Sequence, residues 1–236
     1  MIDIHSHLLP TIDDGARSLQ ETIDMVKEAK SAGFTDIVTT SHYIDGQFDV
    51  NKNDRKILIS KLQELLDDEI KLHNGAEAYV TPELVSLYQK GIIPTLADSR
   101  YVLFELPMNS DVLYLDRVIS ELINYDYIPI IAHPERYKIV QKDINKAYNM
   151  IEKGALLQCN FSSFIGHYGH EAQKVAVKLL KKDKIAFLGS DAHRSEGVYT
   201  RIEEVLTKLE KTVGYEKIEE ITVSNPQKIL DKEYFD

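Results

Sequence analysis

Cysteine is almost absent from this sequence, with Cys159 as the single thiol among 236 residues. One cysteine cannot form an intramolecular disulfide, and it cannot supply the thiolates of a cysteine-based zinc site. The chain also lacks any run of about 18 apolar residues that could span a membrane. Its first residues, MIDIHSHLLP, lack the basic segment and apolar run of a signal peptide. These absences predict a soluble protein of the reducing cytoplasm.

Positive charge is scarce as well. The chain has 28 Lys and Arg residues against 38 Asp and Glu residues, a formal net charge of −10 at pH 7. A chain this acidic is a poor general binder of nucleic acid or anionic membrane, and no basic stripe is visible in the sequence. The excess carboxylates could bind metal ions or keep the protein soluble. With 43% hydrophobic residues, the chain can form a substantial core.

Short apolar runs alternate with longer segments of helical periodicity along the chain. The runs predict strands at about 1–5, 36–40, 71–78, 101–106, 128–132, 155–160 and 185–190. The periodic segments predict helices from a Ser18/Glu21 capping box, over 52–68, from Thr81-Pro82-Glu83, over 113–125, 143–153, 170–182 and 201–213, and from Asn225-Pro226. This alternation predicts an α/β fold with a parallel sheet covered by helices. The sheet could be an open doubly wound sheet or a barrel.

Polar side chains at the strand ends favour the barrel. Six of the seven predicted strands deliver His, Asp or Glu at the same end. These segments are His5-Ser6-His7 with Asp13-Asp14, then Ser41-His42, Gly75-Ala76-Glu77, Phe104-Glu105, His133-Pro134-Glu135 and Asp191-Ala192-His193. An open sheet would scatter such ends across its width, whereas a barrel gathers them in one ring. We therefore expect a distorted barrel of about seven parallel strands with its site at the C-terminal strand ends.

The ring supplies about nine candidate metal ligands. An ion usually takes three or four protein ligands, so nine suit two or three ions. Imidazole and carboxylate without thiolate suit Mn²⁺, Fe²⁺ or Zn²⁺. Each member also has a simpler interpretation: Glu105 could form a buried salt bridge, Glu77 could lie in a solvated turn, and residues 191–193 could be structural. The other histidines, which are His73, His167 and His170, are expected at the surface without a role.

Six segments together resemble a known family. MIDIHSHLLPTIDDG, TTSHY, NGAEAYVT, FELPMNS, PIIAHPERY and LGSDAH are similar to motifs of the polymerase-and-histidinol-phosphatase (PHP) superfamily. Within it, they most resemble the bacterial manganese-dependent protein-tyrosine phosphatases of capsule and exopolysaccharide gene clusters, the CpsB/CapC family. The resemblance covers nearly the whole chain. It implies a single PHP domain over residues 1–236, a distorted (β/α)7 TIM-like barrel with a three-metal site.

The resemblance also implies a role for individual residues. The first ion would be held by His5, His7, Glu77 and Asp191. Glu77 would bridge to a second ion, completed by Glu105 and His133, and a third would be held by Asp14, His42 and His193. The expected catalytic residues are Arg136, which would bind the phosphate, with Asp191, His42 and His193. A second family arginine is missing, because its position is Val198; Arg194 and Arg201 are the candidates to replace it.

The implied activity is hydrolysis of phosphotyrosine by a hydroxide that bridges the metal ions. Its expected substrate is the tyrosine-rich tail of a capsule-assembly tyrosine kinase, which would regulate capsule or exopolysaccharide synthesis. A cysteine-dependent phosphatase is excluded, because the residue six positions after Cys159 is Ile165 rather than arginine, and no Asp-x-Asp or P-loop motif is present. Three alternatives stay open: a histidinol phosphatase, a PHP nuclease, and a non-catalytic metal-binding regulator.

Overall fold

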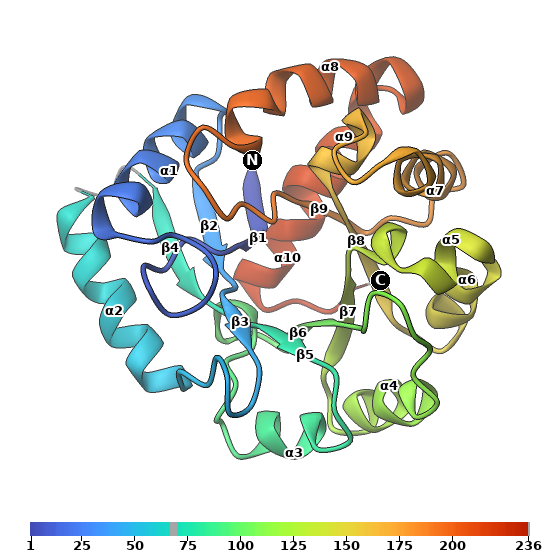
Figure 1. The fold of residues 1–236 in the computed structure, drawn as a ribbon, viewed down its shortest axis with the longest axis horizontal. Helices are drawn as coiled ribbons and strands as arrows, with labels where there is room; N and C mark the ends of the chain where they lie inside the picture. The colour runs from blue at the N-terminus through green and yellow to red at the C-terminus, as the bar shows by residue number, and fades with distance from the viewer. Residues whose placement is uncertain (67–69, 236) are drawn as a thin grey trace.

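The computed structural model describes residues 1–66 and 70–235, and the strands in these ranges form one curled parallel sheet in two hydrogen-bonded parts (Figure 1). The first part has the order β1 (Ile2–Ser6), β2 (Asp36–Thr39), β4 (Lys71–Asn74). The second has the order β3 (His42–Tyr43), β5 (Glu77–Tyr79), β6 (Tyr101–Glu105), β7 (Ile128–Ala132), β8 (Leu156–Asn160), β9 (Phe187–Gly189). Every pair of neighbouring strands is parallel, which confirms the α/β fold.

Backbone hydrogen bonds connect the last strand to the first. The Asp191 amide donates to the carbonyl of His5 at 2.7 Å, and the His7 amide donates to the carbonyl of Ala192 at 2.9 Å. These bonds join the residues just after β9 to the C-terminal end of β1. The curl of the sheet therefore brings the segments that carry the predicted site residues next to each other.

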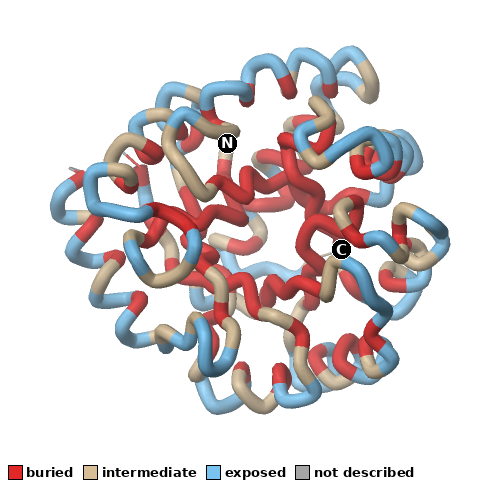
Figure 2. Tube along the Cα trace, viewed as in Figure 1, coloured by how far each residue is buried: buried red, intermediate tan, exposed pale blue. Residues whose placement is uncertain are grey.

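Helices surround the sheet, with buried inner faces and exposed outer faces (Figures 1 and 2). They are α1 (Leu19–Ser31), α2 (Lys52–Leu65), α3 (Leu84–Gln89), α4 (Leu115–Asn124), α5 (Lys138–Lys142), α6 (Asn145–Glu152), α7 (His170–Lys181), α8 (Ile202–Val213), α9 (Tyr215–Glu219) and α10 (Asn225–Asp231). Short 3₁₀ turns span Leu96–Asp98, Pro134–Arg136, Phe161–Ile165 and Val198–Arg201, and a π-helical segment spans Glu220–Ser224. No helix in the described ranges is long and apolar enough to cross a bilayer.

Two apolar layers hold the fold together. A large cluster fills the space between the helices and the outer face of the sheet. A smaller one lies inside the curl, where Tyr101, Leu103, Ile130 and Phe187 are completely buried. Ile229 of α10 packs into this inner cluster and covers its end. The polar site at the C-terminal strand ends therefore rests on an apolar plug.

Several expected elements differ in their bounds. The helix expected from Pro82 begins at Leu84 instead, since the Leu84 amide bonds to the Thr81 carbonyl in a turn. The helix expected over 52–68 ends at Leu65, and residues 67 and 68 of that range lie outside the described residues. Ser18 caps α1 as predicted by accepting from the Glu21 amide. The α5 and α9 helices were not expected.

The largest departure is that one predicted strand is broken and that a short strand, β3, was not predicted. The expected strand over 71–78 is β4 followed by β5, with Gly75 and Ala76 between them, and the chain after β2 resumes as β3. A Cβ on Gly75 would lie 2.7 Å from Val38 Cγ1 of the neighbouring strand β2, so only glycine fits between β4 and β5. After the breaks, His42 pairs with Glu77 across β3 and β5. The breaks thus place two candidate ligands side by side.

A buried arginine holds the breaks together. Arg55 of α2 is completely buried and donates to the carbonyl oxygens of Ser41 at 2.8 Å, His42 at 2.7 Å and Gly75 at 3.4 Å, while its Nε donates to Val50 at 2.7 Å. Burial lowers the pKa of its guanidinium to about 10, so it stays charged at neutral pH. Its donors satisfy carbonyls that the interrupted strands leave unpaired.

Arg55→Met should therefore destabilise the protein. The substitution keeps apolar volume but leaves buried carbonyls without a donor, at about 1–3 kcal/mol for each unsatisfied group. We expect the free energy of unfolding in urea to fall by about 3 kcal/mol or more. Lys61→Met, at an exposed position of the same helix, is the control and should change it by less than about 0.5 kcal/mol. Equal stability of the two variants would contradict this role.

Candidate metal centre

Three groups of potential ligands meet at the C-terminal ends of the strands, and in each group the ligand atoms lie within 4.8 Å of one another. The groups are His5, His7, Glu77, Asp191; His42, Glu77, Glu105; and His7, Asp14, His42, His193. The remaining predicted residue, His133, lies beside Glu77, with 2.8 Å between its Nε2 and Glu77 Oε1. The structure thus brings all nine predicted ligands together.

Glu77 is the centre of the arrangement. Its side chain is fully buried, and its Oε2 lies 3.3 Å from His5 Nε2, 3.3 Å from His7 Nε2 and 3.2 Å from His42 Nδ1. With His133 on Oε1, one carboxylate faces four imidazoles. Burial would raise its pKa, but the charges of three neighbouring histidines outweigh this and hold the pKa of Glu77 well below its usual range. Glu77 is therefore an ionised carboxylate in the interior.

Successive side chains of a strand point to opposite faces, so His5 in β1 and His7 just after it point to the same face of the sheet. Their Nε2 atoms are 3.2 Å apart, and Asp191 Oδ1 lies 3.4 Å from the first and 3.3 Å from the second. Burial lowers the pKa of His5, but the carboxylates of Glu77 and Asp191 raise it to about 9. In the absence of a cation these imidazoles take up protons, so a metal ion and protons would compete for the same nitrogens.

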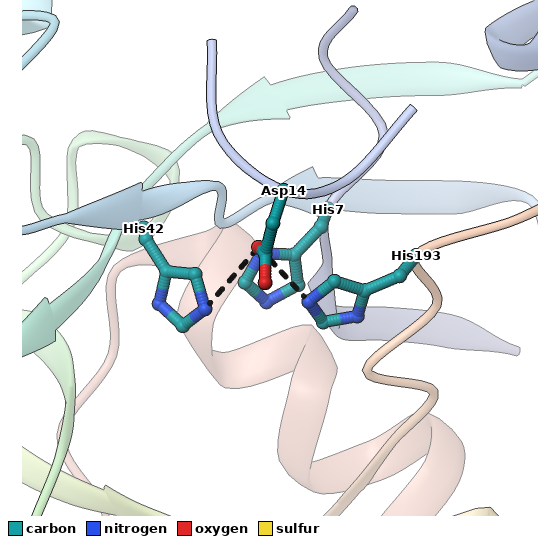
Figure 3. Close-up of side chains that lie close together, drawn as sticks. All are labelled: His7, Asp14, His42 and His193. Atoms are coloured by element: carbon teal, nitrogen blue, oxygen red, sulfur yellow. Dashed lines mark ion pairs between the residues drawn. The ribbon is translucent and has the colours of Figure 1, made fainter. Parts of the chain in front are cut away.

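The third group, drawn in Figure 3, contains the most exposed of the candidate ligands. The carboxylate of Asp14 sits among three imidazoles, with Oδ1 at 3.6 Å from His42 Nε2 and 3.4 Å from His193 Nε2. The ring of His7 stacks on that of His193, with 3.9 Å between centroids. Asp14 is the exposed member, since 59% of its side chain is accessible. This group forms the open side of the centre.

Two site residues have a left-handed backbone. His133 has φ 34° and Asp191 has φ 53°, a region that non-glycine residues enter only when their surroundings compensate for the strain. His133 follows β7 directly, and Asp191 lies two residues after β9. Both side chains lie among the candidate ligands at the strand ends.

Unpaired atoms test whether the centre fits metal ions. Glu77 Oε2, His42 Nδ1 and His133 Nδ1 are buried and have no hydrogen-bond partner among the described residues. Leaving such atoms unpaired costs free energy, and a divalent cation would satisfy the inward-facing lone pairs of Glu77 and His42. The imidazole and carboxylate donors suit Mn²⁺, Fe²⁺ or Zn²⁺. The residues therefore fit a multinuclear metal centre.

Cys159 takes no part in this centre. It is buried in β8, and burial, followed by the nearby Glu135 carboxylate, raises the pKa of its thiol well above the usual range. A thiol that stays protonated is neither a nucleophile nor a metal ligand. The geometry thus agrees with the sequence-based exclusion of a cysteine phosphatase.

The residues that orient the candidate metal ligands were not predicted from the sequence. Asp13 Oδ2 lies 2.8 Å from His7 Nδ1 and accepts the His42 amide at 2.8 Å, and its Oδ1 accepts the Gly15 amide. A Cβ on Gly15 would lie 2.2 Å from the His7 carbonyl oxygen, so the loop approaches β1 as closely as glycine allows. The doubled Asp13-Asp14 was the available signal, since one carboxylate can orient a ligand while the next binds metal.

Two more orienting residues come from β8, the single predicted strand without His, Asp or Glu at its end. Gln158 Oε1 lies 2.7 Å from His5 Nδ1, and Asn160 Nδ2 donates to Asp191 Oδ2 at 2.7 Å. Both are completely buried. The sequence did contain a sign of this role, since two amide side chains stand two positions apart in an otherwise apolar strand. A buried amide needs a polar partner.

Arg136 follows β7 in a 3₁₀ turn and borders the centre. Its Nη1 donates to Asp191 Oδ2 at 2.7 Å, and its guanidinium lies over the ring of Tyr168 at 4.4 Å. Both residues line a cleft of about 500 Å³ beside the candidate ligands Asp191 and His193. Burial would lower the pKa of Arg136, but the Asp191 carboxylate outweighs this and raises it. The cleft thus has a fixed positive charge next to the metal ligands.

The same cleft contains Val198, Arg194 and Arg201. Arg194 is held by backbone carbonyls, since its Nη1 donates to Asp14 at 2.7 Å and to His193 at 2.6 Å. Arg201 forms an exposed ion pair with Glu204 at 2.9 Å. Arg201 is therefore the easier of the two to redirect toward a ligand, because exposed ion pairs are weak.

The three histidines without a predicted role lie outside the centre. His73 pairs with Asp36 at 2.8 Å in β4, one of the strands that precede the breaks. His167 lines the cleft, and His170 is exposed at the first position of α7.

Asp13→Asn should weaken metal binding without unfolding the protein. The amide keeps the volume but loses the charge that orients the His7 imidazole, and loss of such a partner typically costs 10–100-fold in metal affinity. Competition with a chelating dye should measure this loss for Mn²⁺. Asp24→Asn on α1 removes the same charge away from the centre and is the control. Unchanged affinity in Asp13→Asn would show that the His7 orientation does not depend on this carboxylate.

The chain is similar in sequence to bacterial proteins over most of its length. The chain is 33% identical over 225 residues to CapC of Staphylococcus aureus, covering 93% of this chain and 87% of that protein. It is 32% identical over 222 residues to the tyrosine-protein phosphatase YwqE of Bacillus subtilis, covering 92% and 86%.

Solved structures show the same fold. A crystal structure from a study of YwqE and of CpsB from Streptococcus pneumoniae, described as metal-dependent tyrosine phosphatases, superimposes with a TM-score of 0.95 at 29% identity over 100% of this chain and 96% of that one. The histidinol phosphate phosphatase of Lactococcus lactis matches with a TM-score of 0.60 at 17% identity, over 91% and 95%, and shares the fold. The family of CpsB/CapC capsular polysaccharide synthesis proteins matches residues 1–231, and the chain belongs to this family.

Proposed function

We propose that this chain, a metal-dependent tyrosine phosphatase of the CpsB/CapC family, dephosphorylates a bacterial tyrosine kinase that controls capsule or exopolysaccharide synthesis. The observation that carries the proposal is the convergence of nine His, Asp and Glu side chains beside a cleft that contains Arg136. Residues 1–236 would act as one PHP-type domain. Its site of action would be the cytoplasm, where the kinase tail is phosphorylated.

The proposed metal ions are Mn²⁺, two or three in number, with Fe²⁺ or Zn²⁺ as the other ions that suit these donors. The first would be held by His5, His7, Glu77 and Asp191, the second by Glu77, Glu105 and His133, and the third by Asp14, His42 and His193. Bound ions would supply an activated water and neutralise the phosphate charge. The buried ionised Glu77 supports its role as the shared ligand.

The protein's own residues would orient the phosphoryl group. Arg136 has its guanidinium braced between Asp191 and Tyr168, so it can donate to phosphate oxygens without first losing side-chain freedom. The apolar faces of Tyr168 and Val198 in the cleft suit the phenyl ring of the substrate. His42 and His193 lie at the open side, with 14% and 29% of their side chains accessible, where as ligands they would face the bound phosphoryl group.

Metal removal should abolish the activity. We expect exhaustive chelation to stop hydrolysis of a phosphotyrosine peptide, and Mn²⁺ to restore it better than Fe²⁺ or Zn²⁺. Cys159→Ser should keep full activity, because the thiol is buried and protonated. Parallel assays with histidinol phosphate and an oligonucleotide separate the alternative activities. Hydrolysis that survives chelation, or its loss in Cys159→Ser, would contradict the mechanism.

Arg136→Ala should lower kcat/KM about ten- to hundredfold, since one charge-assisted contact to phosphate is worth about 1.5–3 kcal/mol. Its metal content, measured by mass spectrometry, should stay that of the unaltered protein. Arg201→Ala and Arg194→Ala test which arginine compensates for Val198. We expect the larger loss in Arg201→Ala, because Arg194 is held by carbonyl oxygens. Unchanged kcat/KM in Arg136→Ala would place the phosphate on another side of the centre.

A further inference from the structure

A lysine-lined groove runs along the outside of α7. It has a volume of about 480 Å³, and its lining includes four exposed lysines, which are Lys174, Lys178, Lys181 and Lys182. Lys174, Lys178 and Lys181 are spaced by four and three residues, which places them on one face of α7, and Lys182 follows directly after the helix. Lys208 of α8 lies on the opposite wall. This group of lysines was not predicted from the sequence, although four of the five lie within residues 174–182.

Most of this positive charge is not neutralised by the protein. Among the described residues, Lys178, Lys181 and Lys182 form no ion pair, and Lys174 has a single acidic neighbour, Glu171, at 3.9 Å. Lys208 Nζ donates to the carbonyl of Phe164 at 2.8 Å, which fixes its position on the wall. In a chain with a net charge of −10, such a local concentration of lysines creates a positive potential where the rest of the surface repels anions.

The groove begins near the cleft beside the metal centre. Tyr168 lines the cleft, and His170, two residues later, lines the beginning of the groove. Two residues of chain span at most about 7 Å, so the two depressions lie next to each other. The helix α7 has 12 residues and a length of about 18 Å. An extended polypeptide that leaves the cleft would place about five or six residues along it.

We propose that this groove binds an acidic segment that flanks the phosphotyrosine in the protein substrate. This inference rests on the proposed function, since it assumes a phosphotyrosine in the adjacent cleft. The groove is concave and includes the apolar side chain of Val177 in its lining, which suits an extended peptide rather than a flat anionic bilayer. The lysine side chains are flexible, and they attract carboxylates without requiring one geometry. The groove would thus select substrates by charge several residues away from the reacting bond.

The experiment compares phosphotyrosine peptides that differ in one flank. One carries six Asp or Glu residues starting three residues after the phosphotyrosine, a second carries them before it, and the third has Asn and Gln in the same places. At low salt we expect one acidic peptide to have a KM about tenfold below that of the neutral one, with similar kcat. The difference should fall below about twofold at 0.5 M salt, because screening shortens the range of the attraction.

The test variant replaces Lys174, Lys178, Lys181 and Lys182 by Gln, and the control variant replaces Lys27, Lys61, Lys71 and Lys90, four exposed lysines outside the groove. Both lose four charges. The test variant should lose the tenfold preference, and the control should keep it. The single charge reversal Lys178→Glu should weaken the preference as well, which gives a second variant with minimal change to α7.

The outcomes separate this proposal from the proposed function. Hydrolysis of p-nitrophenyl phosphate and of the neutral peptide reports on the metal centre alone, and both should be the same in all variants. If no phosphotyrosine peptide is hydrolysed, the proposed function fails; if all three peptides have equal KM, the groove proposal fails. Equal loss in both quadruple variants would assign the effect to net charge. Retention on phosphatidylglycerol vesicles that depends on the four groove lysines, without any peptide preference, would assign the groove to a membrane instead.

Discussion

A buried negative charge is the constraint on which this structure depends. Glu77 is ionised in the interior, and such a charge is tolerated only where positive or metal partners surround it. Its partners are four histidines from three separate segments of the chain. The strands must therefore end at one place, and the sheet must curl far enough for β9 to meet β1. The apolar plug of Tyr101, Leu103 and Phe187 fills the space beneath the charges.

The irregular features of the fold serve this convergence. The breaks after β2 and β4 bring His42 opposite Glu77, and Arg55 satisfies the carbonyls that the breaks leave unpaired. His133 and Asp191, which have left-handed backbone angles, contribute side chains to the groups of candidate ligands. Each irregularity costs stability locally, and each sits where a regular strand would direct a ligand elsewhere.

Three regions of the protein would have separate roles in the proposed function. The enclosed groups around Glu77 would hold the metal ions, and the cleft with Arg136 would hold the phosphotyrosine. The groove along α7 would read the flanking sequence of the substrate. Chemistry would then be common to any phosphotyrosine, whereas selection would come from a surface outside the centre. Such separation lets charge tune the choice of substrate without disturbing the ligands.

Much of the fold and the centre could be predicted because its signals are local. Apolar runs alternating with helical segments predict a parallel α/β fold, and the charged side chains directly after the runs predict where a site lies. The resemblance of six segments then singled out Asp14 from the pair Asp13-Asp14. Most of these residues stand out because a buried His, Asp or Glu at the end of an apolar strand is costly unless it is paired or binds a metal ion.

The residues that support the centre were decided by the tertiary structure. Asp13, Gln158 and Asn160 orient the ligands His7, His5 and Asp191, respectively. The last two pairs are far apart in the sequence, so residue spacing does not reveal them. Arg55 lies in an amphipathic helix, and from the sequence alone it would be expected on the exposed face of that helix. The pairing of His42 with Glu77 across β3 and β5 likewise arises only when separate elements pack together. The sequence by itself determined which chemistry gathers at the strand ends; the packing decided its orientation, because hydrogen bonds and electrostatic fields depend on distances that only the folded chain sets.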